Sequence, residues 1–129
     1  MTANNQTTAQ LQKKELDRAI ERADHYLKGY LLNKKLLRLD RYEKEFLGAK
    51  ESDSSEFFGE GALARARMFE IRHFIMELAN SDEKLFLYYH YIKGESAERC
   101  GELLGISRSS AFRMKRRALA MVAMAKEGQ

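Results

Sequence analysis

The chain has 129 residues, 23 of them basic and 19 acidic, and a net charge of +4; this length suffices for one domain, or for a small domain with a helical arm. Ala, Leu, Glu, Lys and Arg fill 68 positions, whereas Val, Ile and Thr fill 9 and proline is absent. Because strands favour β-branched side chains, this composition predicts an all-α fold and excludes a β-rich one. The single cysteine, Cys100, excludes an internal disulfide framework and a cysteine-based zinc site.

No segment has the pattern of a secretion or membrane signal. The first eight residues lack the apolar core of a signal peptide. The longest apolar run, residues 118–125, is far shorter than the ~20 residues that cross a bilayer. The sequence therefore predicts a cytoplasmic protein that has no membrane partner.

Residues 1–49 divide into a tail and a helical arm. Residues 1–10 are polar and aperiodic, which predicts a disordered tail. Residues 11–49 are periodic, and their first apolar stripe consists of Leu16, Ile20, Ala23, Leu27 and Tyr30. The second stripe consists of Leu32, Leu36, Leu39, Glu43 and Phe46. One straight helix cannot present both stripes on the same side, so the slip predicts a kink, a stutter or two helices.

The sequence leaves two roles open for this arm. A continuous helix would be about 55 Å long at ~1.5 Å per residue, which is too long for the rest of a small protein to cover. This length favours an oligomerisation arm that pairs two copies of the chain. The alternative is a helical hairpin that packs over the remaining helices of the same chain.

Residues 50–61 are rich in Ser, Asp and Gly and predict a linker loop, in which Phe57-Phe58 is either a packing anchor or a docking site for a partner. The helical domain then spans residues 62–129. Its first helix is predicted over residues 62–79. A second helix follows over residues 82–93, with Asn80 as the expected N-cap.

The stretch from residue 96 to 122 has the outline of a helix-turn-helix. Ser96 is placed to cap a short helix over residues 97–104, and Gly105 supplies the left-handed residue that ends it. Ser107 is placed to cap a second helix that runs through Arg108 to Met121 or beyond. Two helices joined by so short a glycine-containing turn are typical of this motif.

The faces of the second motif helix separate by polarity. Its inward stripe is Ala111, Met114, Ala118 and Val122. Its opposite face carries Ser109, Arg113 and Arg116, with Phe112 and Arg117 on the flanks. Gly101 is expected where the two helices approach closely. A helix with such a small or cationic face fits the major groove of DNA.

Charge also separates along the chain. Residues 51–92 carry 4 basic and 8 acidic side chains, whereas residues 93–129 carry 8 basic and 4 acidic ones. A basic end beside an acidic middle indicates either a polyanion-binding surface or a solvated helical face. The predicted DNA-binding residues are Lys93, Ser107, Arg108, Ser109, Ser110, Phe112, Arg113, Arg116 and Arg117.

A resemblance extends this interpretation. The segments Tyr91-Ile92-Lys93-Gly94 and Leu103-Leu104-Gly105-Ile106-Ser107 resemble region four of bacterial sigma factors. The following Phe112-Arg113-Met114-Lys115-Arg116-Arg117 is similar to phage transcriptional regulators of the ArpU and RinA type. The resemblance covers roughly residues 80–122 and implies a DNA-binding regulator of phage or bacterial origin, with RNA polymerase as a further candidate partner.

Other chemistry has little support in the sequence. The three histidines, His25, His73 and His90, lack metal-ligand spacing. No catalytic constellation or phosphate-binding loop is present, so we expect neither a cofactor nor a metal site, and no enzymatic activity.

The sequence thus predicts a homodimeric transcriptional regulator that binds double-stranded DNA, with its N-terminal helices pairing two copies. Two alternatives remain at this point. One is a helical adaptor or assembly protein whose basic helix binds an acidic protein partner. The other is a subunit of a ring-shaped phage DNA-packaging assembly.

Overall fold

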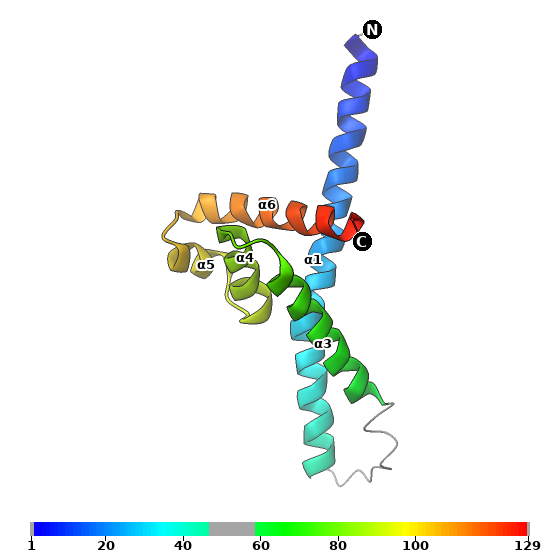
Figure 1. Cartoon of the computed structure of the whole chain (residues 1–129), viewed down its shortest axis with the longest axis vertical. Coiled ribbons are helices and arrows are strands. Elements are labelled where there is room, and N and C mark those ends of the chain that lie inside the picture. The colour runs from blue at the N-terminus through cyan, green and yellow to red at the C-terminus, as the bar shows by residue number, and fades with distance from the viewer. Residues whose placement is uncertain (1, 47–58, 129) are drawn as a thin grey trace.

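The structure is a computed structural model that describes residues 2–46 and 59–128. All regular structure in these residues is helical, which confirms the all-α class. The elements are α1 (Thr2–Phe46), α3 (Glu60–Glu77), α4 (Asp82–Leu87), the π-helical η1 (Tyr88–Ile92), α5 (Ala97–Leu104) and α6 (Arg108–Glu127). The long helix α1 runs the length of the molecule, and the other helices lie against its middle and its C-terminal half (Figure 1).

Helix α1 corrects two predictions about the N-terminal part of the chain. It begins at Thr2, so the residues after Met1 in the predicted tail are helical; no proline or glycine before Gly29 interrupts them. It also continues without a break past Gly29, so the two-helix interpretation of residues 11–49 is wrong.

The slip between the two apolar stripes places them on opposite sides of this one helix. Leu27 and Leu36 are nine residues apart, as are Tyr30 and Leu39. Nine residues make two and a half turns at ~3.6 residues per turn, so these pairs point in opposite directions. Leu27 is fully buried, whereas Leu36 and Leu39 are exposed. From Ile20 to Tyr30 the first stripe therefore serves the core of this chain, whereas its first member, Leu16, is exposed. The second stripe faces away from the core.

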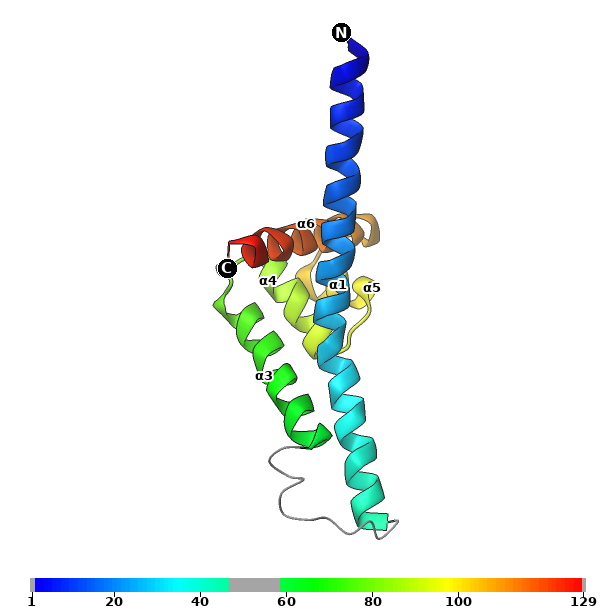
Figure 2. The ribbon, with the colours of Figure 1, turned by 90° about the vertical axis from the view of Figure 1, so that its right-hand side faces the viewer.

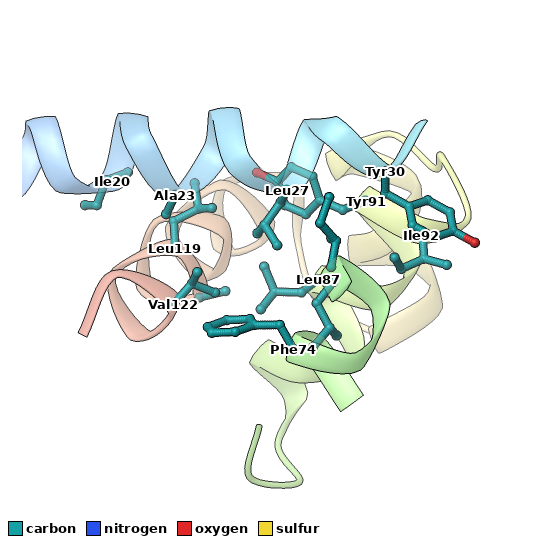
Figure 3. Packing of buried hydrophobic residues seen from close by; sticks show 13 residues of the cluster. Ile20, Ala23, Leu27, Tyr30, Phe74, Leu87, Tyr91, Ile92, Leu119 and Val122 are labelled. Atoms are coloured by element: carbon teal, nitrogen blue, oxygen red, sulfur yellow. The ribbon is translucent and has the colours of Figure 1, made fainter. Parts of the chain in front are cut away.

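The main core forms where α1 crosses the other helices. Leu27 of α1 meets Phe74 of α3, Leu87 of α4 and Val122 of α6, as Figure 3 shows. Tyr91 of η1 completes the same cluster. Because the first stripe of α1 is built into this core, its middle is an integral part of the fold and not a free arm.

Helix α3 returns along the C-terminal half of α1 (Figure 2). It begins at Glu60, two residues before the predicted start, with Gly59 as its N-cap. Most of the predicted linker, including Phe57-Phe58, lies outside the described residues. Ser81 caps α4 by accepting a hydrogen bond from the Lys84 N–H at 3.3 Å.

The Asn80 cap predicted for this helix is therefore wrong by one residue. The Asn80 side chain instead accepts a hydrogen bond from the Lys84 ammonium at 3.1 Å.

Candidate nucleic-acid interface

Helices α4, α5 and α6 enclose a second, smaller core. Phe86 of α4, Cys100 of α5 and Ala111 of α6 are fully buried there, and Ala97 and Met114 join them. Burial raises the pKa of the Cys100 thiol, which packs here as a small apolar side chain. This core holds α5 and α6 in the arrangement that the sequence predicts for a helix-turn-helix.

The turn between the two helices follows the predicted chemistry. Gly105 adopts a φ of 72°, a left-handed conformation that glycine accepts without strain, and it ends α5. Ser96 and Ser107 cap α5 and α6, since each hydroxyl accepts the N–H three residues on. Gly101 lies at the crossing, where an added Cβ would come within 2.9 Å of the Ala111 Cβ.

The first two turns of α6 form an exposed polar surface. Ser109, Phe112 and Arg113 are exposed, whereas Ala111 and Met114 face the core. Arg113 donates from Nη2 to the Ser110 hydroxyl at 3.0 Å. Figure 1 shows this end of α6 projecting to the side, whereas its C-terminal end crosses α1. The N-terminal end of α6 is thus free of α1.

The predicted arginines further along α6 are held by other helices. Arg116 forms an ion pair with Asp17 of α1. Arg117 lies 3.5 Å from a Glu83 carboxylate oxygen of α4. Both arginines are exposed, so these pairs remain exchangeable with solvent and ligands. A phosphate group would have to compete with a carboxylate at each of them.

Two further predicted residues differ in their surroundings. Arg108 pairs with Glu98 of α5 at 3.2 Å and also lies 5.9 Å from the Phe112 ring centroid. Lys93 lies over the Tyr88 ring at 5.5 Å, and among the described residues no hydrogen bond or ion pair joins its side chain to α6. The structure therefore gathers the predicted serines, Phe112 and the arginines on α6, and it leaves Lys93 apart from them.

A polar link between α1 and η1 has no signal in the sequence. Tyr91 donates its hydroxyl to Asp24 at 2.5 Å, and Lys28 pairs with the same carboxylate at 2.8 Å. Partial burial favours the neutral acid, but the hydrogen bonds from Lys28 and Tyr91 outweigh it and hold the pKa of Asp24 below its ordinary value. This link fastens the helix-turn-helix region to α1.

None of the helices within residues 2–46 and 59–128 has the length and apolarity needed to cross a bilayer. Across the same residues, no three His, Cys, Asp or Glu side chains gather as metal ligands do. None of the protein-family models, curated proteins or solved structures compared with the chain matches it.

Proposed function

We propose that the chain is a sequence-specific double-stranded DNA-binding transcriptional regulator, associated with a phage or mobile element, whose helix α6 enters the major groove. The observation that carries this proposal is the exposed N-terminal end of α6, which projects from the closely packed α5–α6 pair and is free of α1. The resemblance of residues 80–122 to sigma region four and to the ArpU and RinA regulators supports it.

The exposed side chains have the chemistry that groove recognition needs. Arg113 offers a planar fork that suits the O6 and N7 acceptors of guanine. Ser109 offers a hydroxyl, and the Phe112 ring offers apolar contact to a thymine methyl group. Arg117 lies about one turn further along, where it would exchange its Glu83 partner for a phosphate.

Pairing of two copies through α1 completes the proposal, because a dimeric helix-turn-helix protein reads two half-sites together. Binding both half-sites raises the affinity through effective concentration, without any new contact on α6.

Selection of binding sites from a random DNA pool tests the proposal. We expect an enriched motif with two-fold symmetry, and isotherms that weaken as salt rises. Enrichment of no motif, together with salt-independent or undetectable binding, would refute the proposal. Capture of an acidic protein by the intact α6 surface would then favour the adaptor alternative. A mass of eight or more subunits would favour the packaging alternative.

A further inference from the structure

The second stripe of α1 is an apolar surface that the described chain leaves uncovered. Leu32, Leu36, Leu39 and Phe46 are 48–68% exposed, although they follow one another at intervals of three, four or seven residues. Leu63, at the start of α3, is 52% exposed and lies beside Leu36 and Leu39. Contiguous apolar patches of this kind on a helical protein mark interaction sites.

The stripe continues into a groove between α1 and α3. The groove has a volume of about 450 Å³, and Leu36 and Leu39 line it on one side, with Leu63 and Ala64 on the other. Asn33 is buried at the groove and donates to the Gly29 carbonyl at 2.6 Å, so its amide is already hydrogen-bonded. The groove therefore combines apolar side chains, which suit an apolar helix, with the charged side chains of Asp40, Glu43 and Arg67.

The spacing of the stripe identifies the kind of helix that would cover it. Residues 32, 36, 39, 43 and 46 follow the alternating four and three spacing of a coiled-coil seam. A seam of this length, with leucine at three consecutive positions, matches a second seam of the same type. Helix α1 itself carries such a seam, so α1 of a second copy is the matching partner.

The polar member of the seam selects the direction of pairing. In a parallel pair, Glu43 would face Glu43 of the second copy, and like charges so placed repel. In an antiparallel pair centred between residues 37 and 38, Leu36 packs on Leu39 of the second copy. Glu43 then lies opposite Leu32, within a helical turn of Lys35. The antiparallel pairing thus replaces a repulsion by an attraction.

We infer that two copies of the chain pair through this stripe and Leu63, with their α1 helices antiparallel across a two-fold axis between residues 37 and 38. The inference deepens the pairing proposed above, because it assigns the face and the direction. Its test needs no DNA, so it fails or succeeds separately from the DNA-binding proposal.

The first experiment measures the mass of the full-length chain by sedimentation equilibrium over a range of concentrations. We expect twice the chain mass of 15.0 kDa. Leu36→Glu and Leu39→Glu should each raise the dimer dissociation constant by on the order of 100-fold or more, because a symmetric dimer loses two buried leucines per substitution. Both side chains are exposed in the single chain, so the melting temperature of the monomer should not fall.

Leu85→Glu is the matched control, because Leu85 is 45% exposed on α4, away from the stripe. This variant should remain dimeric. A monomeric parent chain would overturn the inference. A dimer that survives Leu36→Glu and Leu39→Glu but dissociates with Leu11→Glu would also overturn it, and would move the interface to the N-terminal part of α1.

Oxidative cross-linking tests the direction. The double variant Leu32→Cys, Glu43→Cys should form covalent dimers, and single Leu36→Cys should form few. The native Cys100 is fully buried, so the parent chain gives the background. Efficient self-linking of Leu36→Cys would refute the antiparallel arrangement, because residue 36 faces residue 36 of the second copy only in a parallel pair.

Discussion

Gly101 lies where α5 meets α6, and replacing it tests the helix-turn-helix geometry directly. A Cβ at this position would lie 2.9 Å from the Ala111 Cβ, whereas non-bonded carbons prefer about 3.5–4.0 Å. Both atoms are fixed to helix backbones, so the helices would have to separate by at least ~0.6 Å. Overpacking of this kind costs about 1–3 kcal/mol, and the better helix propensity of alanine offsets about 1 kcal/mol of it. Gly101→Ala should thus lower the free energy of unfolding by up to about 2 kcal/mol.

The reciprocal substitution makes the test specific to this contact. Ala111→Gly should cost about 1 kcal/mol in helix propensity and about 0.8 kcal/mol for the lost methyl group. The double variant moves the methyl group from one helix to the other and removes the clash. It should therefore be more stable than the sum of the single effects by about 1–3 kcal/mol.

Urea denaturation followed by circular dichroism measures all four proteins. Additive effects would mean that Gly101 and Ala111 do not touch, which would refute the close crossing of α5 and α6. Gly101→Glu should lose several kcal/mol of stability, since it both overpacks the crossing and desolvates a charge. A Gly101→Glu protein that melts like the parent would lead to the same conclusion.

The other predictions concern DNA binding and pH. Arg113→Ala should cost ~1–3 kcal/mol of binding free energy on the selected site and relax the preference at one base pair. Arg117→Ala should weaken binding to selected and random DNA alike and reduce the slope of log affinity against log salt by about one. Binding isotherms at several salt concentrations distinguish the two variants, and equal losses of affinity on both DNAs for Arg113→Ala would contradict base reading. The pKa of Asp24 is below its ordinary 3.8 in the folded chain, so the stability it contributes is present above that value and is lost as the pH falls through the folded pKa. Acid titration of the free energy of unfolding should therefore be shallower for Asp24→Asn in this range, and identical curves would mean that the Tyr91–Asp24 link contributes nothing.

Local chemistry in the sequence was sufficient to predict much of the helix-turn-helix. Helix capping by Ser96 and Ser107, and the end of α5 at Gly105, depend on backbone groups within three residues. These roles could therefore be predicted from spacing alone. Gly101 and Ala111 were predictable because a short turn leaves few ways to stack two helices. The π-helical turn at residues 88–92 has no such local signal, and the sequence predicted an ordinary helix there.

The partners of the site residues were beyond prediction for a different reason. Arg116 meets Asp17, which is 99 residues away in the sequence, and Tyr91 meets Asp24 across 67 residues. Such pairs depend on where α6 and η1 cross α1, and no periodicity within one helix specifies that crossing. The slip between the stripes of α1 was visible in the sequence. Its meaning, two opposite faces on one continuous helix, became clear only when the structure showed which face is buried.

The two faces of α1 together predict the spacing of the DNA half-sites. Asp17, which holds Arg116 of α6, lies about 20 residues from the proposed two-fold axis. At ~1.5 Å per residue this is about 30 Å, so the two Arg116–Asp17 pairs would lie about 60 Å apart along an antiparallel α1 pair. The major groove presents the same face every ~34 Å, and 60 Å is nearer to two turns than to one. The half-sites recovered from a random pool should therefore lie about two turns, or ~20 base pairs, apart from centre to centre. Half-sites one turn apart would refute the position of the axis, even if α6 reads DNA as proposed.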